Sequence, residues 1–301
     1  MLTLFLLPLS SYLLFLSILF IPLIGCLTAL YSPVLLINYL LNPLRGKRND
    51  ILFLLFLAAT LLIPFIGFYS NLFYIFFVII PSIFIYNEIL NYKSEKDSSQ
   101  SSFNKAIIYS PLPFLILAII SIILLQEARL ELINYISTGI ESLKLEADSL
   151  TSKEFAYMMY IINNSKKIAT TMVYLLPGMS YAYIISMLYL TCKYFFRKLQ
   201  IKLYFKMPEY LMIVFVCCGF LVLSSNTAAK YISFNTIIIF STIFFLQGID
   251  IINYFLKKIK SSNFIKFITY FLILTQLPIT IIVSFLGLID NWFKFIKDEA
   301  S

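Results

Sequence analysis

The sequence is built from long apolar stretches that are separated by short charged segments. A transmembrane helix needs about 20 consecutive apolar residues to cross the hydrocarbon core of a bilayer. Because stretches of this kind recur along the whole chain, we expect eight or nine membrane-spanning helices. The expected spans are 4–24, 27–42, 51–68, 71–90, 107–125, 168–192, 209–225, 232–256 and 264–288.

Composition excludes the other broad classes of protein. Of the 301 residues, 60% are hydrophobic and 13% are charged, whereas an ordinary soluble domain has about 25% charged residues. A water-soluble protein of this length could not bury so much apolar surface, and a disordered chain would not contain it. We therefore predict an all-α, polytopic transmembrane bundle that forms a single integral membrane domain over residues 1–301.

The first two expected spans leave two arrangements open. Pro22, Gly25 and Pro33 interrupt them, and the stretch 27–42 is short for a span. Residues 1–42 form either two full spans or a kinked hairpin whose second arm is partly re-entrant. A signal peptide begins with a basic region, and because no basic residue precedes Arg45, we expect this segment to be retained.

The basic residues predict an orientation. Of the 23 Lys and Arg residues, 15 lie in four loops that alternate through nine spans. Cytoplasmic loops carry an excess of Lys and Arg, so we expect a cytoplasmic N-terminus and an outer C-terminus. The same bias explains the net charge of +8, and a nucleic acid partner is not expected.

The segment 126–167 lies outside the expected spans, on the predicted outer side. Its apolar residues recur at spacings of three and four, which is typical of an amphipathic helix. Ser152 begins a second expected helix that leads into the span at 168. We expect a helical hairpin that leans on the outer surface, either as a solvated connector or as a lid or partner-docking element. The apolar face comprises Leu130, Ile133, Ile136, Ile140, Leu143 and Ala147.

Several kinds of chemistry have no residues to support them. The chain has no histidine, which removes imidazole bases and histidine-ligated metals. It contains no phosphate-binding GxxxxGK[ST] motif, no GxGxxG and no GxSxG. We predict no catalytic residues, no metal and no cofactor, and any ATP hydrolysis belongs to a partner.

A polar face on the eighth expected span is the clearest candidate site. Gln247, Asp250 and Asn253 follow each other at intervals of three, which places them on one helix face. A carboxylate at the centre of a span costs about 2.5–3.5 kcal/mol on the insertion scale, so such a residue suggests function. Two interpretations stay open: a face that binds a small-molecule ligand or couples protons, and interhelical hydrogen bonding.

Other candidate positions follow from local patterns. Gln276, with Thr275 and Pro278, marks either a kink in the ninth expected span or a further ligand-binding position. Gly25 and Ala29 form a small-xxx-small pair, which lets helices approach closely and is a candidate for helix packing or partner docking. The single tryptophan, Trp292, is expected to anchor the chain at the membrane interface.

Several short motifs resemble the YybS-like family of bacterial multi-pass membrane proteins. The resemblance covers nearly the whole chain and departs from the family at Ile296-Lys297. The motifs are Ser32-Pro33, Arg45-Gly46, Leu176-Pro177-Gly178, Met207-Pro208-Glu209-Tyr210, Asn235, Phe244-Phe245-Leu246-Gln247-Gly248-Ile249, Pro278 and Gly287-Leu288-Ile289-Asp290-Asn291-Trp292-Phe293.

The resemblance implies a bacterial inner membrane and leaves the function open. The family is distantly similar to the substrate-binding subunits of energy-coupling-factor transporters and to the cell-shape protein MreD. One implied function is a small-molecule-binding transport subunit driven by a separate ATPase. The alternative is a non-enzymatic scaffold that recruits envelope or division proteins. An intramembrane enzyme that uses Asp250 or Asp290 is disfavoured, because the expected topology puts them on opposite sides of the bilayer.

Overall fold

The computed structural model describes residues 2–43, 47–61, 67–95, 100–144, 152–200, 204–293 and 295–296. Within these ranges the regular structure is helical throughout, and no strand is formed. This confirms the all-α prediction. Five helical segments are long and apolar enough to cross a membrane, and the number rises to six if one sharply bent pair counts as a span. Three shorter apolar helices, Leu6–Phe20, Asp50–Thr60 and Tyr210–Leu221, lie at other expected spans.

The N-terminal segment is a helical hairpin. Helix α1 (Leu2–Phe20) packs against both α2 (Pro22–Ala29) and α3 (Ser32–Leu40). The chain turns at Ile21, earlier than the expected end of the first span at residue 24, because Pro22 opens α2, a position where its missing N–H costs little. The second arm, Pro22–Leu40, is thereby 19 residues long and meets the length for a full span.

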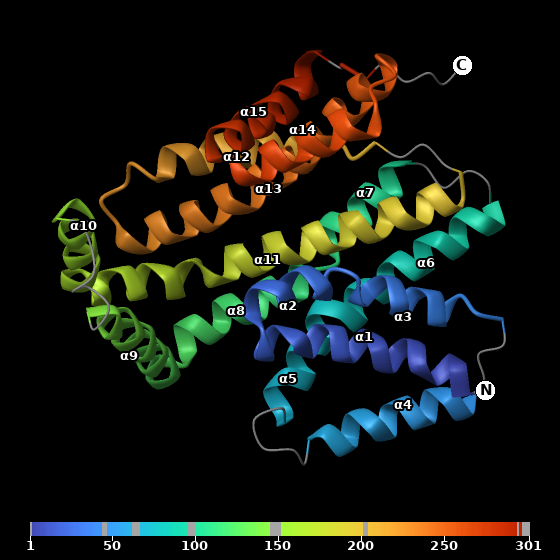
Figure 1. The fold of residues 1–301 in the computed structure, drawn as a ribbon, viewed down its shortest axis with the longest axis horizontal. Helices are drawn as coiled ribbons and strands as arrows, with labels where there is room; N and C mark the ends of the chain where they lie inside the picture. Colours follow the sequence, from blue (N-terminus) through green and yellow to red (C-terminus); the bar gives the residue numbers. More distant parts are fainter. Residues whose placement is uncertain are drawn as a thin grey trace.

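The next helices complete one side of the bundle (Figure 1). They are α4 (Lys47–Thr60), α5 (Gly67–Tyr74), the π-helical turn η1 (Ile75–Ile79), α6 (Ile80–Glu95), α7 (Gln100–Tyr109) and α8 (Leu112–Leu124). Buried hydroxyl groups join this side: Ser11 of α1 bonds Ser32 of α3 and Tyr74 of α5. These bonds satisfy polar groups where the bilayer offers no water.

Helix α11 (Ser165–Lys198) runs through the middle of the molecule (Figure 1). It contacts α3, α6, α7 and α8 on one side and α13 (Thr227–Lys258) on the other. Its buried residues Ile184, Leu188 and Phe195 belong to the main apolar core. With 34 residues, α11 is about 50 Å long, which exceeds the roughly 30 Å thickness of a hydrocarbon core.

The C-terminal helices occupy the expected span at 264–288 and bend within it. Helices α14 (Asn263–Thr275) and α15 (Leu277–Phe293) meet at an angle of 102°. Gln276 between them is extended, with φ −106° and ψ 103°. Pro278 has no N–H to bond the carbonyl of Leu274, so a regular helix is interrupted here. The expected kink is thus a sharp break, and the two helices form either a broken span or a re-entrant loop.

Two glycines explain why α15 stays close to α13. A Cβ atom on Gly248 would clash with the backbone oxygen of Val283, and one on Gly287 would clash with that of Phe244. The two backbones therefore touch where these residues cross, as small residues allow in membrane bundles. Helix α12 (Tyr210–Leu221) packs on the same α13.

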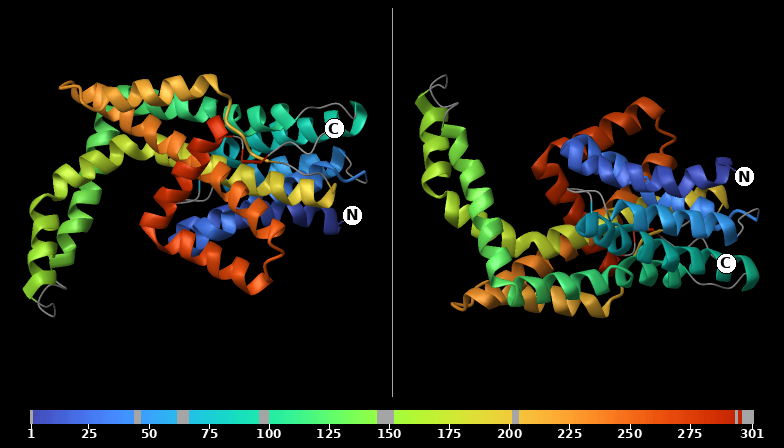
Figure 2. Two further views of the ribbon diagram at one scale, coloured as in Figure 1. Left: turned by 90° about the horizontal axis from the view of Figure 1, so that it is seen from above. Right: turned by 90° about the horizontal axis from the view of Figure 1, so that it is seen from below.

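Helices α9 (Gln126–Ser142) and α10 (Ser152–Asn163) form an arm that projects to one side of the bundle (Figure 2). Ile133 and Ile136 of α9 pack on Ala169 and Val173 of α11, in a cluster separate from the main core. The expected apolar face of α9 is thus partly used, whereas Leu130 is exposed. Ala147 lies outside the described residues.

Candidate functional site

Asp250 is the centre of a buried polar network. Its carboxylate is 1% exposed and accepts a hydrogen bond of 2.5 Å from the Tyr189 hydroxyl. The Lys193 ammonium group lies 2.7 Å from the same oxygen. The other oxygen accepts the backbone N–H of Phe205 at 2.7 Å. A buried charge is tolerated when it is paired and hydrogen-bonded in this way.

The network also binds the backbone of the irregular connector between α11 and α12. Residues 204–208, between α11 and α12, have no regular helix, yet Phe205 and Met207 are each 1% exposed. Buried irregular backbone needs partners for its N–H groups. Asp250 accepts from Phe205, and the Gln247 side-chain oxygen accepts from Met207 at 3.3 Å. Alternate residues of the connector thus bond residues one helical turn apart.

Gln247 also links the network to α15. Its amide nitrogen donates to Asp290 at 3.0 Å and to Asn291 at 3.5 Å. The other Asp290 oxygen accepts the backbone N–H of Phe295 at 2.7 Å. Asp250 and Asp290 therefore lie in one network. The expected topology, in which the ninth span crosses the bilayer, placed these acids on opposite sides, whereas the structure brings them into one network.

The bonding pattern favours interhelical hydrogen bonding over an open ligand site. Both oxygens of Asp250, both ends of the Gln247 amide and both oxygens of Asp290 have protein partners. The network joins α11, the connector, α13 and α15. Among the described residues, no group of three Cys, Asp or Glu side chains could hold a metal ion.

The other sequence-based candidates do not join this network. Asn253 is half-buried and makes no hydrogen bond within the described ranges. Gln276 is exposed at the break between α14 and α15. Trp292 is 64% exposed near the end of α15, where an interface anchor is expected to contact lipid headgroups. The four predicted ligand-binding residues are thus not brought together.

The Gly25 and Ala29 pair contacts the chain's own first helix. A Cβ atom on Gly25 would clash with the backbone of Ser17 and Ile18 in α1, and Ala29 is fully buried. The close approach that this motif allows is therefore used inside the hairpin. In this structure the pair presents no surface to an external partner.

Sequence reasoning missed Tyr189, Lys193 and the connector as partners of Asp250. Tyr189 and Lys193 lie one turn apart at the end of the expected span 168–192, which was the available signal. Tyr189 and Asp250 are 61 residues apart in the sequence, and their contact depends on how α11 packs against α13. Periodicity within one helix cannot reveal a contact of this kind.

A second unforeseen contact joins the motif positions Gly178 and Asn235. The Asn235 side chain accepts the Gly178 N–H at 2.6 Å and donates to the Tyr174 carbonyl at 2.8 Å. A regular helix would join these two backbone groups directly. The amide of α13 thus stands in for a helical bond next to a proline, where membrane helices need such support.

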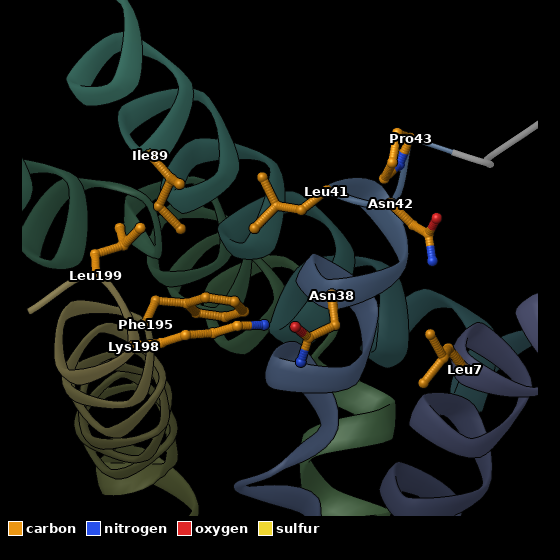
Figure 3. Close-up of a pocket in the computed structure, with 9 residues that line it drawn as sticks. All are labelled: Leu7, Asn38, Leu41, Asn42, Pro43, Ile89, Phe195, Lys198 and Leu199. Atoms are coloured by element: carbon orange, nitrogen blue, oxygen red, sulfur yellow. The ribbon is translucent and has the colours of Figure 1, made fainter.

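The described residues also line a cavity of about 590 Å³ at the end of the bundle where α3 and α11 finish (Figure 3). Three polar side chains, Asn38, Asn42 and Lys198, share it with six apolar residues. Lys198 and Asn38 point toward each other from α11 and α3 (Figure 3). The apolar lining residues are Leu7, Leu41, Pro43, Ile89, Phe195 and Leu199.

Comparison with known proteins identifies the family. No curated protein and no solved structure matches the chain, so the narrower resemblances to YybS-like proteins, to energy-coupling-factor subunits and to MreD stay predictions. One family model, described as "Predicted membrane protein (DUF2232)", matches residues 10–291. With several apolar helices of spanning length and a match over almost its whole length, the chain is a multi-pass membrane protein that belongs to the DUF2232 family of predicted membrane proteins.

Proposed function

We propose that this protein is a non-enzymatic membrane scaffold that recruits a cell-envelope protein through the arm formed by α9 and α10. The projection of this arm from the bundle carries the proposal (Figure 2). The buried network offers no unsatisfied group to a ligand, so the polar face of α13 lends weight to a structural role.

The length of α11 supports a position for the arm outside the hydrocarbon core. About 20 residues of α11 suffice to cross a bilayer, and the remainder of its 34 residues extends beyond it. Ile133 of α9 packs on Ala169 near the start of α11. Arg129 lies 5.5 Å from the ring centre of Tyr174, which fixes the base of the arm to the bundle.

The exposed surface of the arm is rich in aromatic side chains. Tyr135, Tyr157 and Tyr160 are 65–79% exposed, and Phe155 is 43% exposed. Tyrosine contributes large contact areas with a polar end, and it is enriched at protein interfaces. A protein partner that covers these rings would gain apolar contacts.

Site-specific photocrosslinking in living cells tests this function. A photoreactive amino acid at Tyr157 is expected to trap one envelope protein as a discrete adduct, identified by mass spectrometry. The matched control places the same amino acid at Lys230, an exposed position of α13, and is expected to give no such adduct. Equal labelling from both positions, or lipid adducts alone from Tyr157, would refute the scaffold function.

A transport subunit driven by a separate ATPase is the second candidate function. The cavity near Lys198 favours it, since about 590 Å³ lies in the range typical of small-molecule sites. The absence of a nucleotide-binding motif from the sequence agrees with an external energy source. A metabolite panel that leaves the melting temperature of the purified protein unchanged would count against this candidate.

We place the protein in a bacterial inner membrane with a cytoplasmic N-terminus, as the basic loops predict. The expectation of an outer C-terminus rests on a ninth span that crosses the bilayer, and α14 and α15 are bent by 102°. Gln247 bonds both Asp290 near the end of α15 and Met207 of the connector. The connector directly follows the basic end of α11. We therefore propose that the C-terminal end is cytoplasmic as well.

A further inference from the structure

The cavity at the basic end of the bundle combines one cation, two amides and an apolar wall. Within the described residues, neither Lys198 nor Asn38 has a hydrogen bond or an ion pair with protein atoms. Both side chains point into the cavity from opposite helices (Figure 3). The cavity thus presents hydrogen-bond donors that can bind a ligand, whereas the polar groups of the Asp250 network already bond one another and the backbone.

The charge around the cavity favours an anion. No carboxylate lines it among the described residues. The last turn of α11 carries two full positive charges, Arg197 and Lys198, against about half a negative charge from the helix dipole. Asp50, the acid at the start of α4, accepts a hydrogen bond of 2.5 Å from Tyr39 and is not part of the lining.

The apolar wall selects among anions. Six of the nine lining residues are apolar, including the buried Ile89 and Phe195. A free phosphate or nucleotide gains nothing from such a wall, whereas an acyl chain gains roughly 0.8 kcal/mol for each buried CH₂ group. Basic pockets between transmembrane helices at the cytoplasmic side are suited to anionic lipid headgroups.

We propose that this cavity binds an anionic phospholipid. Lys198 bonds the phosphate oxygens, and the Asn38 amide bonds the phosphodiester or glycerol oxygens. Leu7, Leu41 and Phe195 contact the start of an acyl chain. The site is separate from the arm, so this inference goes beyond the scaffold function and does not depend on it.

Lipid binding to the purified full chain in a zwitterionic detergent tests the site. Phosphatidylglycerol, phosphatidylcholine and inorganic phosphate are titrated, with binding measured by native mass spectrometry and by melting temperature. We expect saturable binding of phosphatidylglycerol to the unaltered protein, weaker binding of phosphatidylcholine and no effect of phosphate. Equal binding of the two lipids, or an equal shift with phosphate, would overturn the proposal.

Two variants locate the binding within the molecule. Lys198→Gln is expected to weaken phosphatidylglycerol binding about fivefold, the effect of losing one basic residue at a membrane surface. Lys258→Gln removes a cation from the equivalent last turn of α13, away from the cavity, and is expected to change binding less than twofold. Because both residues are exposed, lipid-free melting temperatures should stay unchanged. Equal losses in the two variants would refute the assignment.

Discussion

Asp250 and Gln247 lie one turn apart on α13 and accept N–H groups from alternate residues of the irregular connector. In an aqueous protein a connector could turn these groups to water. Because Phe205 and Met207 are buried in the protein, each unsatisfied N–H group would cost about 1–3 kcal/mol, so the polar side chains of α13 that accept from them become structural. The residues that most resembled a ligand-binding face thus serve the chain's own backbone.

Asp250→Asn tests the charge in this network. The variant keeps the shape of the side chain and an acceptor for Phe205, but it loses the ion pair with Lys193. Lys193 is 27% exposed and can partly return to solvent, so we expect a loss of about 2 kcal/mol in stability. Thermal unfolding in detergent measures this. Asn253→Ala, one turn along, is expected to cost less than about 1 kcal/mol, and similar losses for both variants would contradict the network's role.

Asn235→Leu tests the support of the Pro177 region. It leaves the Gly178 N–H and the Tyr174 carbonyl without their side-chain partner, and we expect a loss of about 1–2 kcal/mol. Adding Pro177→Ala should recover part of this loss, because a regular helix can then form. Thr236→Val, at the neighbouring half-buried position, provides the control. The explanation fails if the double variant is less stable than Asn235→Leu.

At the scale of helices, hydropathy predicted where apolar elements occur and that all are helical. It did not predict the end of the first helix at Phe20 or the 102° bend after Thr275. Proline marked both places, at Pro22 and Pro278. A proline shows where a helix is easily broken, but the direction of the chain beyond it depends on contacts with α1 and α13. Such contacts are not encoded in local periodicity.

The close contact between α13 and α15 at Gly248 predicts that a larger residue there lowers the stability of the protein. Gly248→Ala would place a methyl group against the Val283 backbone, and overpacking of this kind typically costs about 1–3 kcal/mol. Gly219→Ala in α12, where nothing lies within 4 Å of the added atom, should be neutral or stabilising by up to about 1 kcal/mol. Melting temperatures of the two variants provide the comparison, and equal effects would exclude tight packing at Gly248.

The whole molecule has α11 at its centre, with the N-terminal helices on one side and α12–α15 on the other (Figure 1). The arm extends from one end of α11, and the lipid cavity lies at the other. Because Lys198 and Ser165 end the same continuous helix, the two surfaces share one rigid element.

The position of the C-terminus is testable at this scale. If α14 and α15 return to the side from which they start, a C-terminal green fluorescent protein should be fluorescent and a C-terminal alkaline phosphatase inactive. Phosphatase fused after Ser225, in the turn between α12 and α13, should be active and serves as the control. High phosphatase activity at the C-terminus would instead indicate that the bent pair crosses the bilayer.

The buried connector also imposes an order on biogenesis. Phe205 and Met207 leave the ribosome well before their acceptors, which follow 45 and 40 residues later. Until α13 enters the membrane, these N–H groups are best satisfied by water, so the connector should settle into the bundle late. Asp290 follows Gln247 by a further 43 residues. The network is thus complete only after α15 has been synthesised, and a chain cut short before α15 would enter the membrane without the bond between Gln247 and Asp290.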